Sequence, residues 1–330
     1  MNAPQIATAL LLCAGIGHTQ GLPVSQHPFL DRSDTGVTVH VLPTPASIRP
    51  ALGAQPTEAP VTHLTAVFAP SYGSGKLINH GGPIIAHAGF VAIYWNSSVA
   101  LSTATSLGYT TIQDQIRAFI NAFPKNADWD NDPTDDYEII QQYHGSNGMP
   151  ANTLHDFGSF VGSRVTRSGI TDSEIQDYLS LVFSKGLFAG PNLVYGVYFP
   201  SGMQISLDGA SCSTFCAYHS HFTYKDVQIK YAVFPYPDCA ACSVSGKTVA
   251  DILTIVSSHE IRESVTDPGD NNSGAWFDIL GYEADDKCAW HNLYQMTNGG
   301  FWVQPEFSNG GKFAPSGLQY PGPGCVVPNQ

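Results

Sequence analysis

The chain has 330 residues, and its 27 acidic and 14 basic side chains give a formal net charge of −13 at neutral pH. This charge argues against a protein that binds the phosphate backbone of nucleic acids. Only 12% of the residues are charged and 43% are hydrophobic, which excludes an intrinsically disordered chain. With 32 glycines and 23 prolines, we expect a globular protein that is rich in loops.

The N-terminal region predicts export. Ile6–Ala14 is an apolar run that is too short to cross a bilayer, so we interpret residues 1–21 as a signal peptide and expect a secreted protein without a membrane span. Residues 22–76 are rich in proline and show no periodic pattern, which is typical of a propeptide or a disordered linker. We therefore expect the functional domain to occupy residues 77–330.

Beyond residue 76, segments with strand and helix patterns alternate. This order predicts an α/β fold, a single domain with a mixed central sheet flanked by helices and a loop-rich C-terminal part. Thr171 and Glu174 have the spacing of a capping box at the start of a helix. The predicted elements are, in chain order, a buried strand in Ile84–Trp95, a helix over Thr111–Phe123, a helix from Thr171 to Gly186, and strands at Leu193–Phe199 and Val227–Phe234.

Six of the seven cysteines lie in the last part of the chain, and an even number in a secreted protein predicts three disulfide bonds. They are Cys212, Cys216, Cys239, Cys242, Cys288 and Cys325. The alternative is a zinc site that combines cysteines with His219 and His221; we favour disulfides, and we interpret the two histidines as hydrogen-bonded loop residues. Sequons at Asn96 and Asn271 are compatible with a glycoprotein.

The helix expected after Thr248 changes character along its length. Its apolar positions Val249, Ile252, Leu253 and Val256 form one stripe that faces the core. His259, Glu260 and Glu263 continue this stripe, each within about 60° of Val256 around the helix axis. Asp251 and Arg262 point the opposite way, where we expect solvent. Because a buried ionisable group is costly unless it is paired or coordinated, the inward-facing groups predict a site.

The sequence His259-Glu260-Ile261-Arg262-Glu263 is an HExxE motif, one substitution away from the HExxH motif of zinc peptidases. Residues four positions apart lie on one face of a helix, so His259 and Glu263 would both bind the metal ion. Glu260 would then be the general base that activates water. This pattern predicts a zincin-like active-site helix.

A third metal ligand is expected from the acidic segment that follows. Eight carboxylates and one arginine lie between Glu260 and Asp286. Asp267 could join the ion only if the helix ended there, at Pro268, so we favour Glu283 or Asp286, although all three stay candidates. Ligands that are all oxygen atoms would instead suit Ca²⁺, and the residues available for such a site are Asp267, Asp270, Asn271 and Asp278.

Several segments resemble the EXORDIUM, or phosphate-induced, protein family. They are His80–Ile85 with the strand up to Trp95, Val197–Phe199, Cys212–His219, Cys239–Cys242 and Ser264–Pro268. The chain is most similar to microbial secreted relatives, which combine HExxE with a Thr-Asp-Pro segment, a loop like Ala275–Asp278 and a Glu-x-x-Asp-x-Cys pattern, here Glu283, Asp286 and Cys288. Plant members, which are associated with growth responses of the cell wall, generally lack the counterparts of His259 and Glu260. The resemblance implies this family's fold and secretion.

These observations lead to two functional hypotheses. The first is a secreted, monomeric zinc metallopeptidase that acts on polypeptides, with Zn²⁺ held by His259, Glu263 and a downstream carboxylate. The second is a noncatalytic extracellular protein of EXORDIUM type, associated with the cell wall or extracellular matrix, whose acidic segment binds Ca²⁺ or no metal.

Overall fold

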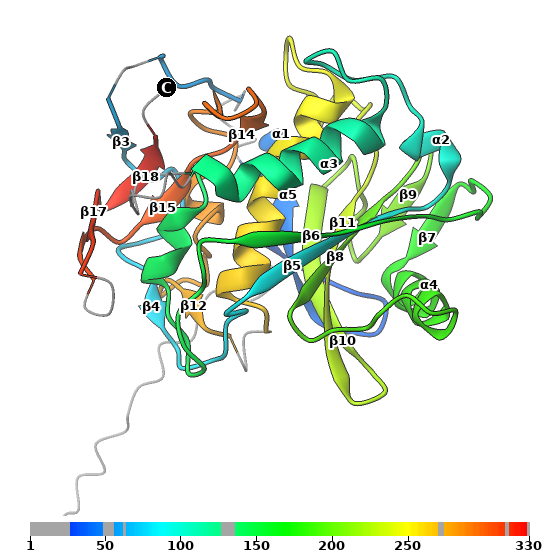
Figure 1. Cartoon of the computed structure of the whole chain (residues 1–330), viewed down its shortest axis with the longest axis horizontal. Coiled ribbons are helices and arrows are strands. Elements are labelled where there is room, and N and C mark those ends of the chain that lie inside the picture. The colour runs from blue at the N-terminus through cyan, green and yellow to red at the C-terminus, as the bar shows by residue number, and fades with distance from the viewer. Residues whose placement is uncertain are drawn as a thin grey trace, which may run out of the picture.

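The computed structural model describes residues 27–48, 56–61, 64–126, 136–269, 274–313 and 317–328 (Figure 1). The predicted signal peptide and the sequon at Asn271 lie outside these ranges. At the other sequon, the side-chain amide of Asn96 donates hydrogen bonds to Arg164 O at 2.9 Å and Thr166 Oγ1 at 3.2 Å. A glycan on this nitrogen would replace one of its two hydrogens, so at least one of these contacts would be lost.

A seven-stranded mixed sheet forms the centre of the molecule, in the order β1-β2-β10-β11-β8-β5-β6. Strands β11, β8, β5 and β6 run parallel, while β1, β2 and β10 join the sheet through antiparallel pairs. The strands are β1 (Leu30–Arg32), β2 (Thr38–Pro43), β5 (Ala88–Tyr94), β6 (Leu154–Val161), β8 (Leu193–Tyr198), β10 (Phe215–Tyr224) and β11 (Val227–Phe234). The prediction of a mixed α/β fold is confirmed.

Helices cover both faces of this sheet (Figure 1). On one face, α3 (Ile112–Ala122) and α5 (Val249–Thr266) pack in the larger core cluster. On the other face, α4 (Asp172–Ser184) packs in a second cluster. The short helices α1 (Pro45–Ile48) and α2 (Ser97–Ala100) complete the five α-helices of the described residues. Thr171 caps α4 in the predicted capping box with Glu174, and Thr111 caps α3.

Short strands and 3₁₀ turns surround this core. The strands are β3 (Ala66–Phe68), β4 (Ile78–Asn79), β7 (Gly169–Thr171), β9 (Gln204–Ser206), β12 (Trp276–Phe277), β13 (Tyr294–Gln295), β14 (Trp302–Val303), β15 (Glu306–Ser308), β16 (Gly311–Lys312), β17 (Gln319–Tyr320) and β18 (Gly324–Val327). The 3₁₀ turns are η2 (Phe123–Asn126), η3 (Glu138–Gln142) and η4 (Asp286–Cys288).

One segment departs from the sequence analysis. Residues 22–76 were expected to be a propeptide or a disordered linker, yet β1 and β2 lie within them and extend the main sheet. The alternation in β2 is hidden in the sequence because both faces are buried: Leu42 packs in the cluster of α5, and Val39 and Val41 in that of α4. Residues 30–43 are therefore part of the folded sheet and not a linker.

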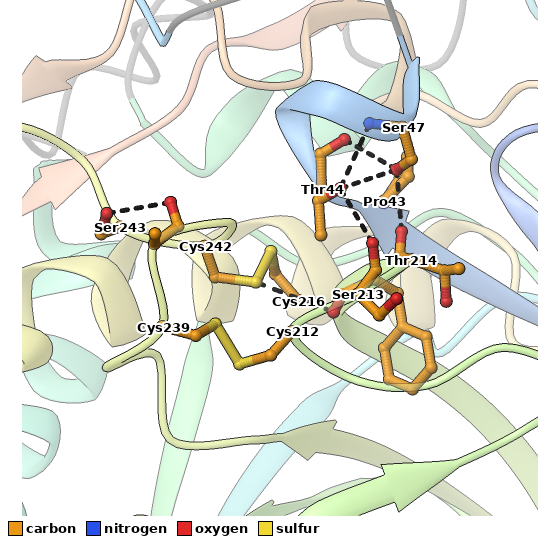
Figure 2. Close-up of a disulfide and its surroundings, with 12 residues drawn as sticks. Pro43, Thr44, Ser47, Cys212, Ser213, Thr214, Cys216, Cys239, Cys242 and Ser243 are labelled. Atoms are coloured by element: carbon orange, nitrogen blue, oxygen red, sulfur yellow. Dashed lines mark hydrogen bonds between the residues drawn. A yellow bond between two sulfur atoms is a disulfide. The ribbon is translucent and has the colours of Figure 1, made fainter. Parts of the chain in front are cut away.

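The three predicted disulfide bonds are present: Cys212–Cys239, Cys216–Cys242 and Cys288–Cys325. The first two join the start of β10 to the loop that leads into α5 (Figure 2). Because all six sulfur atoms are used, the alternative of a cysteine zinc site is wrong. The third bond ties η4 to β18.

Helix α5 is enclosed on all sides. Thr248 Oγ1 accepts a hydrogen bond from the backbone of Asp251, and the Asp251 carboxylate accepts one from the backbone of Thr248. This capping box fixes the start of the helix. Asp251 and Arg262 were expected to face solvent, but they are only 4% and 0% exposed. The expectation is wrong because α3, η3 and β14 cover the face of α5 that is turned away from the sheet.

Among the described residues, none of the helices combines the length and the apolar character that a membrane crossing requires.

Candidate metal centre

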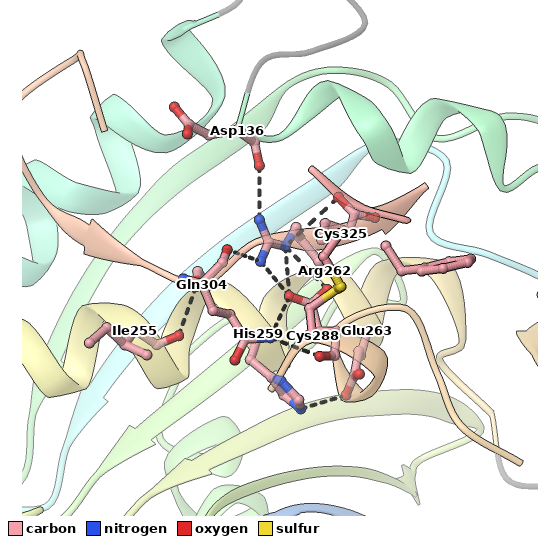
Figure 3. Close-up of polar contacts among 12 residues, drawn as sticks. Asp136, Ile255, His259, Arg262, Glu263, Cys288, Gln304 and Cys325 are labelled. Atoms are coloured by element: carbon pink, nitrogen blue, oxygen red, sulfur yellow. Dashed lines mark hydrogen bonds and ion pairs between the residues drawn. A yellow bond between two sulfur atoms is a disulfide. The ribbon is translucent and has the colours of Figure 1, made fainter. Parts of the chain in front are cut away.

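Helix α5 places His259 and Glu263 one turn apart, and their side chains meet. The Nε2 atom of His259 lies 2.9 Å from Oε2 of Glu263, and both residues are at most 1% exposed. Figure 3 shows the two side chains pointing toward each other, whereas Arg262 leaves the helix in another direction, toward Asp136. The inward orientation expected from the apolar stripe is therefore observed.

The segment around η4 brings the downstream carboxylates to the same point. Oδ1 of Asp286 lies 3.7 Å from Nε2 of His259. Two backbone hydrogen bonds fix this arrangement: Asp286 N donates to Glu263 Oε1 at 2.8 Å, and Glu283 N donates to Asp286 Oδ2 at 2.9 Å. The carboxylates of Glu263 and Asp286 therefore each have one oxygen that accepts a backbone hydrogen bond and one oxygen that is turned toward His259.

Two histidines from the sheet complete the cluster. His219 on β10 places Nδ1 at 3.0 Å from Glu260 Oε2 and Nε2 at 3.7 Å from Glu283 Oε2. His40 on β2 is the cross-strand neighbour of His219; the rings stack with centroids 5.5 Å apart, and His40 Nδ1 lies 2.9 Å from Glu283 Oε1. We call this set the buried cluster; its members are His40, His219, His259, Glu260, Glu263, Glu283 and Asp286.

Burial dominates the electrostatics of the cluster. It raises the pKa of Glu260, Glu263, Glu283 and Asp286 well above the usual range of carboxyl groups, and the neighbouring carboxylates add to the rise. Burial also lowers the pKa of His259 to about 4, against the opposing effects of Asp285 and a hydrogen bond with Gln304. In the absence of a cation, the protein therefore disfavours the charged forms of His259 and of these four carboxyl groups.

The buried cations of the same segments are engaged elsewhere. Arg262 forms an ion pair with Asp285 and donates to the carbonyl oxygens of Asp136 at 3.0 Å and Gln304 at 2.9 Å (Figure 3). Lys287 Nζ lies 2.8 Å from Asp278 Oδ2. Neither Arg262 nor Lys287 therefore forms an ion pair with a carboxylate of the buried cluster among the described residues.

The residues present fit a zinc ion. A tetrahedral Zn²⁺ with bonds of about 2.0–2.2 Å keeps its ligand atoms about 3.3–3.6 Å apart, and the 2.9 and 3.7 Å separations from His259 Nε2 bracket this range. Asp286 Oδ1 and Glu260 Oε1 are buried without a hydrogen bond among the described residues. Buried polar atoms are rarely left in this state, so a ligand is the straightforward explanation. The three atoms from His259, Glu263 and Asp286 would leave a fourth position open.

The other predicted ligands lie apart from this point. Asp267 is the C-terminal cap of α5, and its Oδ1 accepts a hydrogen bond from Ala275 N at 2.6 Å; its charge acts on Glu283. Of the residues proposed for Ca²⁺, Asp270 and Asn271 lie outside the described ranges. Asp278 pairs with Lys287 and accepts hydrogen bonds from the backbone of Leu280 and Tyr282, so its oxygens are already engaged.

Sequence reasoning missed His40, and for His219 it considered metal binding but favoured a hydrogen-bonded loop residue. His219 lies in β10 and is 3% exposed, so the loop interpretation is wrong. The only available signal was the alternation of Ala217, His219 and His221 on one strand face. His40 lies in the segment expected to be a linker.

Access to the cluster is narrow. A pocket of about 10 Å³, lined by His40, His219, His221, Pro268 and others, borders it. That volume is at the lower limit for one water molecule. Among the described residues, this pocket therefore has room for one water molecule at most and is too small for a peptide.

The chain matches none of the known protein-family models, curated proteins or solved structures with which it was compared. The likeness to the EXORDIUM family thus rests on the motifs of the sequence alone.

Proposed function

We propose that the protein is a secreted zinc-dependent hydrolase of peptide bonds, with a zincin-like α5 helix. The observation that carries the proposal is that Glu263 Oε2 and Asp286 Oδ1 lie 2.9 and 3.7 Å from His259 Nε2, in a fully buried position. Histidine and carboxylate side chains are zinc ligands, and three protein ligands with an open fourth position are the arrangement of a catalytic zinc ion. Zinc at this position would supply a Lewis acid and lower the pKa of water.

Glu260 would act as the general base. An oxygen of Glu260 lies within 4.8 Å of ligand atoms of His259 and Glu263. Its Oε2 is held by His219 Nδ1 at 3.0 Å, and its Oε1 has no hydrogen bond among the described residues. Glu260 therefore has a fixed orientation and one oxygen that can take a proton from the attacking water and pass it to the leaving amine.

Substrate binding would require an opening of the site. The walls of the pocket beside the cluster include Thr38 and His40 of β2 and, far along the chain, Pro268 and Gly269. This pocket holds about one water molecule at most, so a polypeptide could reach the metal position only after the described structure opens. This requirement gives weight to a second candidate function, a noncatalytic extracellular protein with a structural metal ion. The observation that favours it is the complete burial of all the ligands.

The test uses the purified full chain loaded with zinc, with casein as the substrate. We expect Glu260→Gln to retain the zinc ion and to lower the rate of cleavage by about 10²–10⁴-fold, the range typical of a lost general base. Glu174→Gln is the matched control, because glutamine also serves in the capping box of α4, and it should cleave at the wild-type rate.

Two outcomes would contradict the proposal. Cleavage at an unchanged rate in Glu260→Gln would show that the activity arises elsewhere. Zinc binding without any cleavage by the wild-type protein would favour the noncatalytic candidate.

A further inference from the structure

The buried cluster contains more ligand atoms than one metal ion can use. His259, Glu263 and Asp286 suffice for the first position, yet His219 and Glu283 form a second group with Glu263, in which one ligand atom of each residue lies within 4.8 Å of the others. We propose that a second divalent cation binds between His219 and Glu283, with Glu263 shared by both positions. This inference builds on metal binding at the first position, which is part of the proposed function.

The shared atom is Oε2 of Glu263. The other oxygen, Oε1, accepts the hydrogen bond from Asp286 N at 2.8 Å, so the carboxylate has one oxygen left for metal ions. That oxygen lies 2.9 Å from His259 Nε2 on one side and 3.8 Å from His219 Nδ1 on the other. His219 Nδ1 is itself held by Glu260 Oε2 at 3.0 Å, so Nε2 of the same ring is the atom left for a metal ion. Because ligand atoms of His219, Glu263 and Glu283 lie within 4.8 Å of one another, the Glu263 carboxylate lies between the first position, at His259, and the second, at His219.

The second position has unused ligand atoms of its own. Nε2 of His219 and both carboxylate oxygens of Glu283 are buried without a hydrogen bond among the described residues, and the two side chains are at most 4% exposed. These atoms face each other, with His219 Nε2 at 3.7 Å from Glu283 Oε2. His40 adds a third side chain, because its Nδ1 lies 2.9 Å from Glu283 Oε1.

The balance of charge supports two cations. The cluster holds the carboxylates of Glu260, Glu263, Glu283 and Asp286, a formal charge of −4 if all are ionised, and the neighbouring Arg262 and Lys287 are paired elsewhere. One divalent cation would leave a charge of −2 in a buried site, which is costly. Two divalent cations neutralise the cluster. Imidazole and carboxylate ligands suit zinc and similar transition metals, and pairs of such ions sharing ligands occur in hydrolytic enzymes.

The first experiment measures stoichiometry in the wild-type protein. The full chain is stripped with a chelator and titrated with Zn²⁺ by isothermal calorimetry, and the metal content of the dialysed product is measured by plasma mass spectrometry. We expect two zinc ions per chain. A single zinc ion per chain at saturation would overturn the second position, because the cluster would then hold its excess carboxylates in the protonated form.

Variants of single residues show which side chains bind each of the two zinc ions. We expect Glu283→Gln and His219→Ala to retain one zinc ion per chain, and Glu263→Gln to weaken the binding of both. His155→Ala removes an exposed histidine on β6, so this control should retain two. If Glu283→Gln and His219→Ala both bound two ions as tightly as the wild type, the second ion would be at another place and the inference would be wrong.

The failure of this inference is distinguishable from the failure of the proposed function. One zinc ion that is lost in His259→Ala and kept in His219→Ala would remove the second position and leave the proposed hydrolase intact. No zinc in the wild type at saturation would overturn both.

Discussion

The two faces of the central sheet treat buried carboxylates in opposite ways. On the α4 face, Asp172 is surrounded by donors: Tyr218 and Tyr231 each donate to Oδ1 at 2.6 Å, and Gln176 donates to Oδ2 at 2.8 Å. On the α5 face, both oxygens of Glu283 and one oxygen each of Glu260 and Asp286 have no hydrogen bond among the described residues.

The pKa shifts follow this difference. Burial raises the pKa of Asp172, but its three hydrogen bonds oppose the rise. For Glu260 and Glu283 the neighbouring carboxylates add to the effect of burial, and the pKa is raised well above its usual value. The same fold can thus satisfy an internal carboxylate with its own donors. Where it does not, an external partner is the simplest explanation, and a metal cation has the required charge.

The largest effect on stability is expected at the ion pair next to the cluster. Arg262→Leu would leave Asp285 buried without its cation, which we expect to lower the free energy of unfolding by about 3–5 kcal/mol in denaturant titrations. The double variant Arg262→Leu/Asp285→Leu should recover most of the loss. Arg167→Leu, which removes the half-exposed pair with Glu174, should cost less than about 1 kcal/mol. Equal losses of the free energy of unfolding in the two arginine variants would contradict this prediction, because they would show that the buried Asp285 does not depend on Arg262.

Zinc should stabilise the folded protein only by binding to the buried cluster on the α5 face of the sheet. At a free zinc concentration 100 times the dissociation constant, the free energy of unfolding should exceed that of the chelated protein by about 2.7 kcal/mol. His259→Ala should lower this difference, the double variant His259→Ala/His219→Ala should abolish it, and Asp172→Asn should keep it. A gain that persists in the double variant would locate the stabilising ion outside the buried cluster.

Neutralising one carboxylate on each face should have opposite results in the chelated protein. Asp172→Asn disturbs a carboxylate with three donors, and we expect a loss of about 1–3 kcal/mol. Glu283→Gln replaces a buried carboxyl group that lacks donors and whose ionised form is disfavoured, so we expect no loss, or a gain, near pH 7.5. Thermal denaturation of both variants under the same conditions tests the comparison. A large loss for Glu283→Gln would mean that its carboxylate is already satisfied without metal.

The pH dependence of the chelated protein should be governed by the cluster. The raised pKa values of its carboxyl groups mean that the folded state keeps protons which the unfolded state releases, so stability falls as pH rises. Burial lowers the pKa of His259 and His219, and this acts in the opposite direction, but only below their unfolded value of about 6.5.

Between pH 6.5 and 7.5 the carboxyl groups therefore determine how the free energy of unfolding depends on pH. We expect this free energy to fall by about 1.4 kcal/mol per pH unit for each proton that the folded state retains and the unfolded state releases. Urea titrations measure the fall. Saturating zinc should remove the fall because the ligands bind it deprotonated. A flat profile in the chelated protein would contradict the pKa shifts.

The sequence was sufficient to predict the elements with a strong local pattern. The apolar stripe of α5 predicted which way His259 and Glu263 point, because helical periodicity is a property of consecutive residues. The capping box of α4 and the cap Thr248 of α5 were predictable because they too depend on residues close in the chain, and the three disulfides were predictable from the even number of cysteines. The proximity of Glu283 and Asp286 to α5 was expected from the concentration of acidic residues and the nearby Cys288.

Other parts of the cluster could not be predicted from the sequence. His40 and His219 are neighbours only because β2 and β10 pair in one register, and no local pattern specifies the pairing of strands so distant in the chain. Arg262 was assigned to solvent because a helical wheel assumes one buried face, whereas α3, η3 and β14 cover the second face of α5. Its partner Asp285 belongs to a different segment.

The position of β2 has a consequence for maturation. β2 lies between β1 and β10 in the sheet, so a proteolytically processed form that began at residue 77 would lose the imidazole of His40. It would also expose the backbone hydrogen-bonding groups of β10 along an open sheet edge. Such an edge can accept an extended polypeptide by strand addition, directly beside His219. Removal of the N-terminal strands would thus create a peptide-binding groove at the place where the intact chain is closed.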